Sequence, residues 1–325
     1  MIHAGSRLPV LFFLLLLPCS CDRGPEISGK AAQVTEEPGK IYTTFYPTQY
    51  FTNRLVGNQV EVVCPVPADE DAIFWMPGRE ALAAYQAADL IVLNGAGFAK
   101  WVEKASLPPS RVVDTAAGFS DRFLRYENAI KHQHGPGGEH SHEGLDGHTW
   151  VDPLLAILQA EAIAGALKER WPDRAGEWLE GFAALEKDLR ELDRRLTAFS
   201  KAWGQRPLLA SHPAYNYLVQ RYGWNLLNLD LDPETVPDGD VLHEIEHELE
   251  DHQARVLIWE GEPLPEVAER LEQKFGLINV VFSPVELLGE DERNSGEDYL
   301  TLMQGNLDRL EALLAPDRGL LQPTG

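Results

Sequence analysis

The stretch RAGEWLEGFAALEKDLRELDRRLTAFSKAW, from Arg174 to Trp203, decides how the rest of the chain is organised. Its apolar side chains recur at spacings of three and four residues, which is the period of an amphipathic α-helix. These side chains are Trp178, Phe182, Leu185, Leu189, Leu192 and Leu196. A helix of about 30 residues is roughly 45 Å long, enough to run along two lobes and join them. We therefore predict one long linking helix within residues 171–205.

On both sides of this helix, short β-like apolar runs alternate with helical patterns. The runs before it predict strands at 41–45, 60–66, 90–94 and 112–114, and helices at 49–56, 78–88, 98–105 and 153–170. Those after it predict strands at 207–210, 225–229, 256–259 and 279–282, and helices at 214–222, 240–253, 265–275 and 299–314. This alternation predicts an α/β fold with two lobes, residues 41–170 and 206–325, each a mostly parallel sheet flanked by helices.

The N-terminus has the pattern of an export signal. A basic residue, Arg7, precedes an apolar run from Leu8 to Leu17. The run is too short to cross a membrane, which takes about 20 helical residues, so we expect cleavage. Cys21 follows a small residue after this run, as in a bacterial lipobox, and Cys19 is the competing candidate. We predict removal of residues 1–20, a lipid anchor on Cys21 in a periplasmic or other extracytoplasmic location, and a flexible tether over 21–40.

The net charge excludes one large class of partner. At pH 7 the chain carries a formal charge of -23, and no cluster of Lys and Arg interrupts the acidic residues. Binding to nucleic acid depends on basic side chains that neutralise phosphates. We therefore predict that the protein does not bind nucleic acid.

Half of the ten histidines lie between His132 and His148, in a segment that also contains several glycines. Neutral imidazole is a strong ligand for zinc, copper and nickel, and a histidine-rich tract can bind metal without a rigid site. We predict a flexible metal-binding loop over 131–148. Its accessory ligands would be His132, His134, His140 and His142. His148 differs because it directly precedes Thr149-Trp150-Val151-Asp152-Pro153, where the ordered pattern resumes.

Two further residues follow predicted strands of the second lobe. His212 comes after the strand at 207–210, and Glu260 comes after the strand at 256–259. Ligands of parallel sheets bind outside the carboxyl ends of strands. Together with His148, these residues would supply two imidazoles and one carboxylate, a donor set that suits zinc.

The order and spacing of several motifs make the chain resemble the zinc- and manganese-binding receptors of bacterial ABC importers, the cluster A-I solute-binding proteins. The motifs are Ala88-Asp89-Leu90-Ile91-Val92-Leu93-Asn94-Gly95, His148 to Pro153, Ser211-His212-Pro213-Ala214-Tyr215, Asp232-Pro233-Glu234 and Ile258-Trp259-Glu260. The resemblance implies that His148 and His212 are ligands from opposite lobes and that Glu260 takes the place of the family's carboxylate ligand. It also implies a monomeric binding protein, not an enzyme, that delivers its ion to an ABC permease and its ATPase.

The cargo implied by this resemblance is zinc. A histidine at position 212 looks like the zinc members of the family, whereas the manganese members tend to have a carboxylate there, and nitrogen is the softer ligand. A manganese or iron receptor of the same family remains the alternative. A surface metal buffer or adhesin without a transporter is a further one.

One part of the family pattern is missing here. The family's first ligand is a histidine in an Asp-Pro-His segment after the second strand, but residues 67–77 contain no histidine. Asp71 is the candidate substitute, with Asp69 and Glu70 as alternatives. A loop histidine or a water molecule could also complete a tetrahedral zinc.

A competing motif lies in the predicted helix at 240–253. His243, Glu244 and His247 match the HExxH pattern of zinc metalloproteases. However, Leu242 and Ile245 define the apolar face of that helix, and this directs both histidines towards solvent. We therefore predict a solvated helix face and keep the protease as an alternative function.

Overall fold

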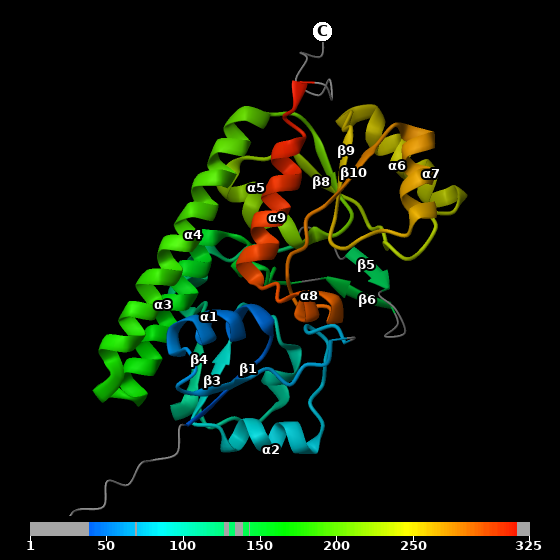
Figure 1. The fold of residues 1–325 in the computed structure, drawn as a ribbon. Helices are drawn as coiled ribbons and strands as arrows, with labels where there is room; N and C mark the ends of the chain where they lie inside the picture. The colour runs from blue at the N-terminus through cyan, green and yellow to red at the C-terminus, as the bar shows by residue number, and fades with distance from the viewer. Residues whose placement is uncertain (1–38, 69, 127–129, 134–138, 143, 317–325) are drawn as a thin grey trace, which may run out of the picture. The chain divides into compact units, whose positions relative to one another are not determined.

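The computed structural model describes residues 39–68, 70–126, 130–133, 139–142 and 144–316 (Figure 1). The described residues all belong to one compact unit. The predicted signal peptide, Cys21 and all but the last two residues of the predicted tether lie outside the described residues, as do Asp69 and His134. None of the described helices is both long enough and apolar enough to cross a membrane.

The first sheet is four-stranded and wholly parallel, in the order β2-β1-β3-β4. Its strands are β1 (Lys40–Thr43), β2 (Glu61–Val63), β3 (Leu90–Leu93) and β4 (Val112–Asp114). The connections contain α1 (Tyr46–Val56), α2 (Arg79–Ala87) and the 3₁₀ helices η1 (Lys100–Lys104) and η2 (Pro109–Arg111), and η3 (Ala117–Arg122) follows β4. The α-helix predicted at 98–105 was wrong: the chain passes through Gly95, Ala96 and Gly97, which all have positive φ, and then forms only the short 3₁₀ helix η1.

The second sheet is also four-stranded and parallel, in the order β10-β9-β7-β8. Its strands are β7 (Leu208–Ala210), β8 (Leu226–Asn228), β9 (Val256–Trp259) and β10 (Ile278–Val281). The connections contain η7 (Pro213–Tyr215), α5 (Asn216–Tyr222), α6 (Gly239–His252) and α7 (Pro265–Phe275), and α8 (Glu290–Ser295) follows the sheet. We call the part built on β1 to β4 the N-terminal lobe and the part built on β7 to β10 the C-terminal lobe. The predicted architecture of two parallel sheets is confirmed.

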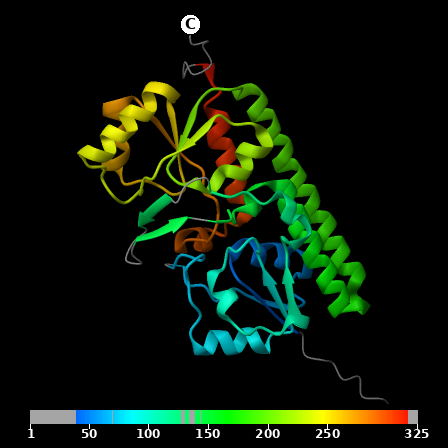
Figure 2. The same cartoon turned by 180° about the vertical axis from the view of Figure 1, so that it is seen from behind.

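The predicted linking helix is α4 (Ala175–Trp203), preceded by α3 (Pro153–Arg170) and η6 (Pro172–Arg174). It packs against α1 beside the first sheet and against α5 and α9 (Tyr299–Ala312) beside the second (Figures 1 and 2). The residues of α4 that bury against these elements are Trp178, Leu185, Leu189, Leu192, Leu196, Phe199 and Trp203. They belong to one apolar core that includes residues of both sheets and so runs through the two lobes, while a second, smaller core lies within the C-terminal lobe.

The histidine-rich segment contains regular structure that the sequence did not predict. β5 (Ile130–Gln133) pairs antiparallel with β6 (Glu139–His142), and the backbone of His132 lies opposite that of His140. Two further contacts join the ends of the segment. Arg125 pairs with Leu145 as an isolated β-bridge, and Tyr126 N donates a hydrogen bond of 3.2 Å to Gly144 O. Residues 130–133 and 139–142 are therefore paired strands and not irregular loop, with the antiparallel pairing setting their register.

Candidate metal centre

His148 lies between strand β6 and helix α3. It precedes the 3₁₀ helix η5 (Thr149–Val151) and has no exposed surface. Asp152 then caps α3 by accepting hydrogen bonds from the backbone N–H groups of Leu154 and Leu155. The Trp150 indole donates to Pro284 O at 2.7 Å and ties this segment to the loop that follows β10. Local capping and this long-range bond together fix the backbone of His148.

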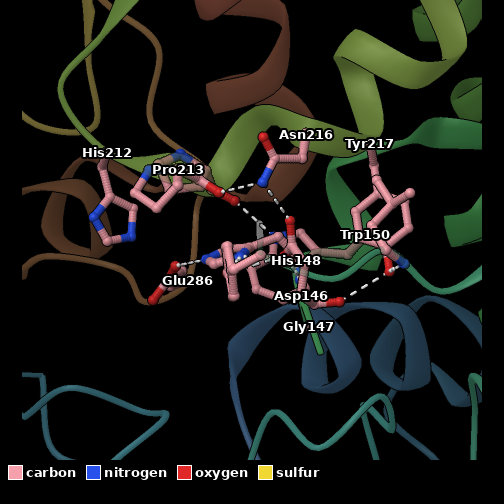
Figure 3. Close-up of polar contacts among 12 residues, drawn as sticks. Asp146, Gly147, His148, Trp150, His212, Pro213, Asn216, Tyr217 and Glu286 are labelled. Atoms are coloured by element: carbon pink, nitrogen blue, oxygen red, sulfur yellow. Dashed lines mark hydrogen bonds and ion pairs between the residues drawn. The ribbon is translucent and has the colours of Figure 1, made fainter. Parts of the chain in front are cut away.

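The ring of His148 is oriented by Asp146. Oδ1 of Asp146 lies 2.8 Å from Nδ1 of His148 and also accepts from the His148 backbone N–H at 2.9 Å (Figure 3). Asn216, from the C-terminal lobe, donates to the other carboxylate oxygen at 2.9 Å. Because Asp146 accepts at Nδ1, the opposite ring atom, Nε2, points away from Asp146 and towards the rest of the site.

His212 follows β7 at the carboxyl end of the strand, in extended conformation, and is 5% exposed. Its ring centroid lies 5.9 Å from that of His148. The two imidazoles, which are 64 residues apart in sequence, therefore face one another within a buried site, as the sequence predicted for ligands from the two halves of the chain.

A third residue, Glu286, joins the two histidines and was missed from the sequence. Its Oε1 lies 2.9 Å from Nε2 of His148 (Figure 3). The preceding residue, Val285, has a φ of 60°, an unusual conformation for a β-branched side chain, and its N–H donates to Ser283 Oγ at 3.1 Å. The constrained turn after β10 thus positions the carboxylate. The available signal in the sequence was only that Glu286 follows a strand, as His212 and Glu260 do.

These three residues meet the geometric condition for a metal site. One ligand atom from each of His148, His212 and Glu286 lies within 4.8 Å of the other two, and within the described residues they are the one such group of three. Two imidazole nitrogens and one carboxylate oxygen form a donor set used by zinc, which takes a fourth ligand from protein or water.

Glu260 lies beside this group, with its Oε2 3.5 Å from Nδ1 of His212. Burial is the main reason that the pKa of Glu260 is raised to about 8; the negative charges of Glu286, Asp71 and Asp232 add to this rise, and His148 opposes it. Asp71, the other predicted carboxylate ligand, accepts a hydrogen bond from the Ile73 N–H at 2.8 Å. The structure therefore brings Glu260 and Asp71 into the electrostatic surroundings of the site, outside the group of three.

The charge state of His148 reflects the same crowding of carboxylates. Burial alone would lower the pKa of His148, but Asp146 and Glu286 outweigh it and raise the pKa to about 10. Without a metal, the protonated ring donates from Nδ1 to Asp146 and from Nε2 to Glu286. The Nε2 proton thus occupies the position that a cation would take between His148 and Glu286.

The other histidines predicted as ligands are less fully described. His132, His140 and His142 lie on the paired strands β5 and β6, but their side chains are outside the described part of the structure. On α6, Leu242 and Ile245 are buried whereas the His243 side chain is 83% exposed, so the predicted solvated face is confirmed. A metalloprotease helix would direct both of its histidines into a cleft with a third ligand, and no such group of three exists there among the described residues.

The sequence of the chain matches a known protein family. The family described as zinc-uptake complex component A, periplasmic (ZnuA), matches residues 41–313. The chain is 27% identical over 288 residues to the zinc-binding lipoprotein AdcA of Streptococcus pneumoniae, with 87% of this chain covered, and it spans 57% of that relative's length. It is 26% identical over 322 residues to the high-affinity zinc uptake system protein ZnuA of Bacillus subtilis, covering 96% of this chain and 98% of the relative.

A solved structure agrees with these sequence matches. The crystal structure of the Zn(II)-bound ZnuA-like domain of Streptococcus pneumoniae AdcA matches with a TM-score of 0.72 and 25% identity, covering 85% of this chain and 98% of that one. The resemblance drawn from the sequence motifs is thereby confirmed. The chain belongs to the ZnuA family of zinc-uptake complex components, a family of solute-binding proteins and not of enzymes.

Proposed function

We propose that this protein is an extracytoplasmic receptor that captures zinc between its two lobes and delivers it to an ABC permease. One observation carries the proposal: two buried imidazoles and a carboxylate, from His148, His212 and Glu286, converge within 4.8 Å in a member of a zinc-uptake family. The protein would bind zinc by coordination alone, and no bond in a substrate would be made or broken.

The donor set favours zinc over manganese. Imidazole nitrogen is a borderline ligand that suits zinc, whereas manganese prefers carboxylate, carbonyl and water oxygens. The names of the relatives in Streptococcus pneumoniae and Bacillus subtilis include zinc binding and zinc uptake, which supports the same cargo. Manganese and iron are the competing ions that a titration must exclude.

We propose that Glu260 supplies the fourth ligand. Its carboxylate is 3.5 Å from His212, so a small movement of the side chain would bring it to a shared ion. Asp71 is the second candidate for that position, because its charge already acts on Glu260. A water molecule would complete the tetrahedron if neither residue does.

The remaining parts of the proposal concern delivery and attachment. A permease and its ATPase would be the partners, because the family is a component of an uptake complex. Cys21 would carry a lipid anchor after removal of residues 1–20, with residues 21–40 as the tether, and the name of the Streptococcus pneumoniae relative includes the word lipoprotein. The N-terminal lobe would comprise residues 41–170 and the C-terminal lobe residues 206–325, joined by a linker over 171–205.

A calorimetric titration of the mature chain with zinc and with manganese tests the function. Wild type should bind one zinc ion tightly and manganese more weakly, and His148→Ala/His212→Ala should lose at least about 100-fold in zinc affinity, because removing ligands costs more than removing the groups that orient them. Glu272→Gln, an exposed carboxylate on α7, is the matched control and should bind like wild type. Tight zinc binding by the double variant would refute the site, and tighter manganese binding by wild type would refute the cargo.

A further inference from the structure

A cavity of about 510 Å³ lies between α6 and the segment that follows β8. His243, Glu244, His247 and Glu248 line it from the helix, and residues 228–231 line it from the opposite side. Figures 1 and 2 both show α6 on the side of the second sheet remote from α4. The cavity shares no lining residue with the group of His148, His212 and Glu286.

The helix places the two histidines next to each other. Asp238 caps α6 by accepting from the backbone N–H groups of Asp240 and Val241, both at 3.0 Å, and so fixes the first turn. Residues four apart on a helix have Cβ atoms about 5–6 Å apart. Two imidazoles at this spacing on one helix face can hold one metal ion together, as they do in HExxH helices. Because the ordered backbone sets the spacing, binding costs only the freedom of two side chains.

The charge around the cavity also favours a cation. The sequence of α6 contains six carboxylates and neither lysine nor arginine. One cation of the neighbouring helix α7, Lys274, lies 3.9 Å from Glu246, which is also 3.9 Å from Nδ1 of His243. The excess of negative charge raises the local concentration of divalent ions, an effect that salt screens at this exposed position.

We propose that His243 and His247 form a second binding site, for one divalent ion of the borderline class that includes zinc, nickel and copper. Two imidazoles would be its protein ligands, and water or a carboxylate from Glu244, Glu248 or Asp230 would fill the other positions after side-chain rotation. Among the described residues, three ligand atoms lie within 4.8 Å of one another only in the group of His148, His212 and Glu286. Binding at His243 and His247 is therefore weaker than binding at that group. The HExxH sequence then acts as a chelating pair on a helix surface and not as a catalytic centre.

The test needs a chain in which the other proposed ligands are absent. A background variant combines His148→Ala and His212→Ala with serine at His132, His134, His140 and His142, which leaves the α6 pair and His252 as the histidines of the mature chain. Equilibrium dialysis with zinc and with nickel should show one ion bound per chain. Adding His247→Ala should weaken binding about tenfold or more, because loss of a ligand costs at least as much as loss of an orienting group.

Two controls separate chelation from nonspecific attraction. His247→Ala/Glu250→His keeps the number of imidazoles but places the second one about 10.5 Å along the helix axis from His243, too far to share an ion, so it should weaken binding like His247→Ala. Glu250→Gln removes one exposed charge and should leave affinity within about twofold, because a single screened surface charge contributes little. Binding that is equally tight in the spacing variant, or absent in the background, overturns the proposal.

A second measurement covers the case in which the background variant does not fold. Wild type and His247→Ala are each loaded with one equivalent of zinc, and further uptake of nickel is then measured. Wild type should bind at least one more nickel ion than His247→Ala, and equal uptake by the two overturns the proposal.

Discussion

Oδ1 of Asp146 lies 2.8 Å from Nδ1 of His148, and neither side chain has any exposed surface. This contact sets the direction in which His148 can bind a metal, because the ring nitrogen that faces Asp146 is committed to it. Tyr126 donates to the same carboxylate oxygen at 3.2 Å, and Asn216 binds the other oxygen. Residues from both sides of the site therefore orient a single ligand.

Asp146→Asn should weaken zinc binding by about 10–100-fold, the usual cost of removing a carboxylate that orients a histidine ligand. The amide presents its NH₂ or its oxygen to Nδ1 without a negative charge, so the ring is no longer held with Nε2 as the metal-binding atom. Calorimetry measures the change, and Asp121→Asn, an exposed aspartate of η3, is the control. Unchanged affinity in Asp146→Asn would show that the ring is oriented by packing alone.

Glu286→Gln should lower zinc affinity more than Glu260→Gln does. Glu286 Oε1 is 2.9 Å from Nε2 of His148, whereas Glu260 lies 3.5 Å from His212 outside the group of three. Both substitutions keep the size of the side chain, so the comparison isolates the loss of one carboxylate as a metal ligand. A larger loss in Glu260→Gln would reverse the assignment of the principal carboxylate ligand.

Zinc binding should release protons at neutral pH. In the metal-free protein the pKa of His148 is about 10, above the ordinary value of 6.5, so the ring is protonated at pH 7 and must lose a proton to bind zinc. Zinc affinity should therefore keep rising with pH until about pH 10. Calorimetry in buffers of different ionisation enthalpy measures the released proton, and an observed enthalpy that does not depend on the buffer contradicts this prediction.

The same pKa determines how the stability of the metal-free protein depends on pH. Because the folded-state pKa of His148 lies above the unfolded value, its contribution is complete below about pH 6.5 and is lost as pH rises through about 10. Glu260, with a pKa raised from 4.5 to about 8, acts in the same direction at lower pH. Urea unfolding between pH 5 and 10 should show metal-free stability falling with pH and a smaller fall in His148→Ala.

Gly181→Ala should destabilise the fold by about 1–3 kcal/mol, the usual cost of overpacking. Gly181 faces α1, and an added Cβ would lie 2.7 Å from both Cα and the carbonyl oxygen of Leu55. Both contacts are with backbone, which cannot turn aside. Gly165→Ala on α3 is the matched control, because a Cβ there meets nothing within 4 Å.

The control, Gly165→Ala, should stabilise the protein by about 0.5–1 kcal/mol, since alanine in a helix loses less conformational freedom on folding than glycine. Chemical denaturation of both variants checks the pair. A stabilised Gly181→Ala would mean that α1 and α4 can move apart at no cost.

The sequence alone was sufficient for the elements that depend on neighbouring residues. The linking helix was predicted from Arg174 to Trp203 and spans Ala175–Trp203, because its apolar period is a property of that segment alone. His148 and His212 could be chosen as candidate ligands for a similar reason. Each stands beside a local signal, one before the capped start of α3 and the other after a strand.

The tertiary structure alone decided which carboxylate meets the histidines. Glu260 and Glu286 both follow strands of one sheet, so in the sequence they look equivalent. The strand order β10-β9-β7-β8 and the turn at Val285 bring Glu286 to His148 across 138 residues. The pairing of β5 with β6 was hidden in the same way. Contacts of this kind depend on how distant segments pack, and no periodic pattern along the chain records them.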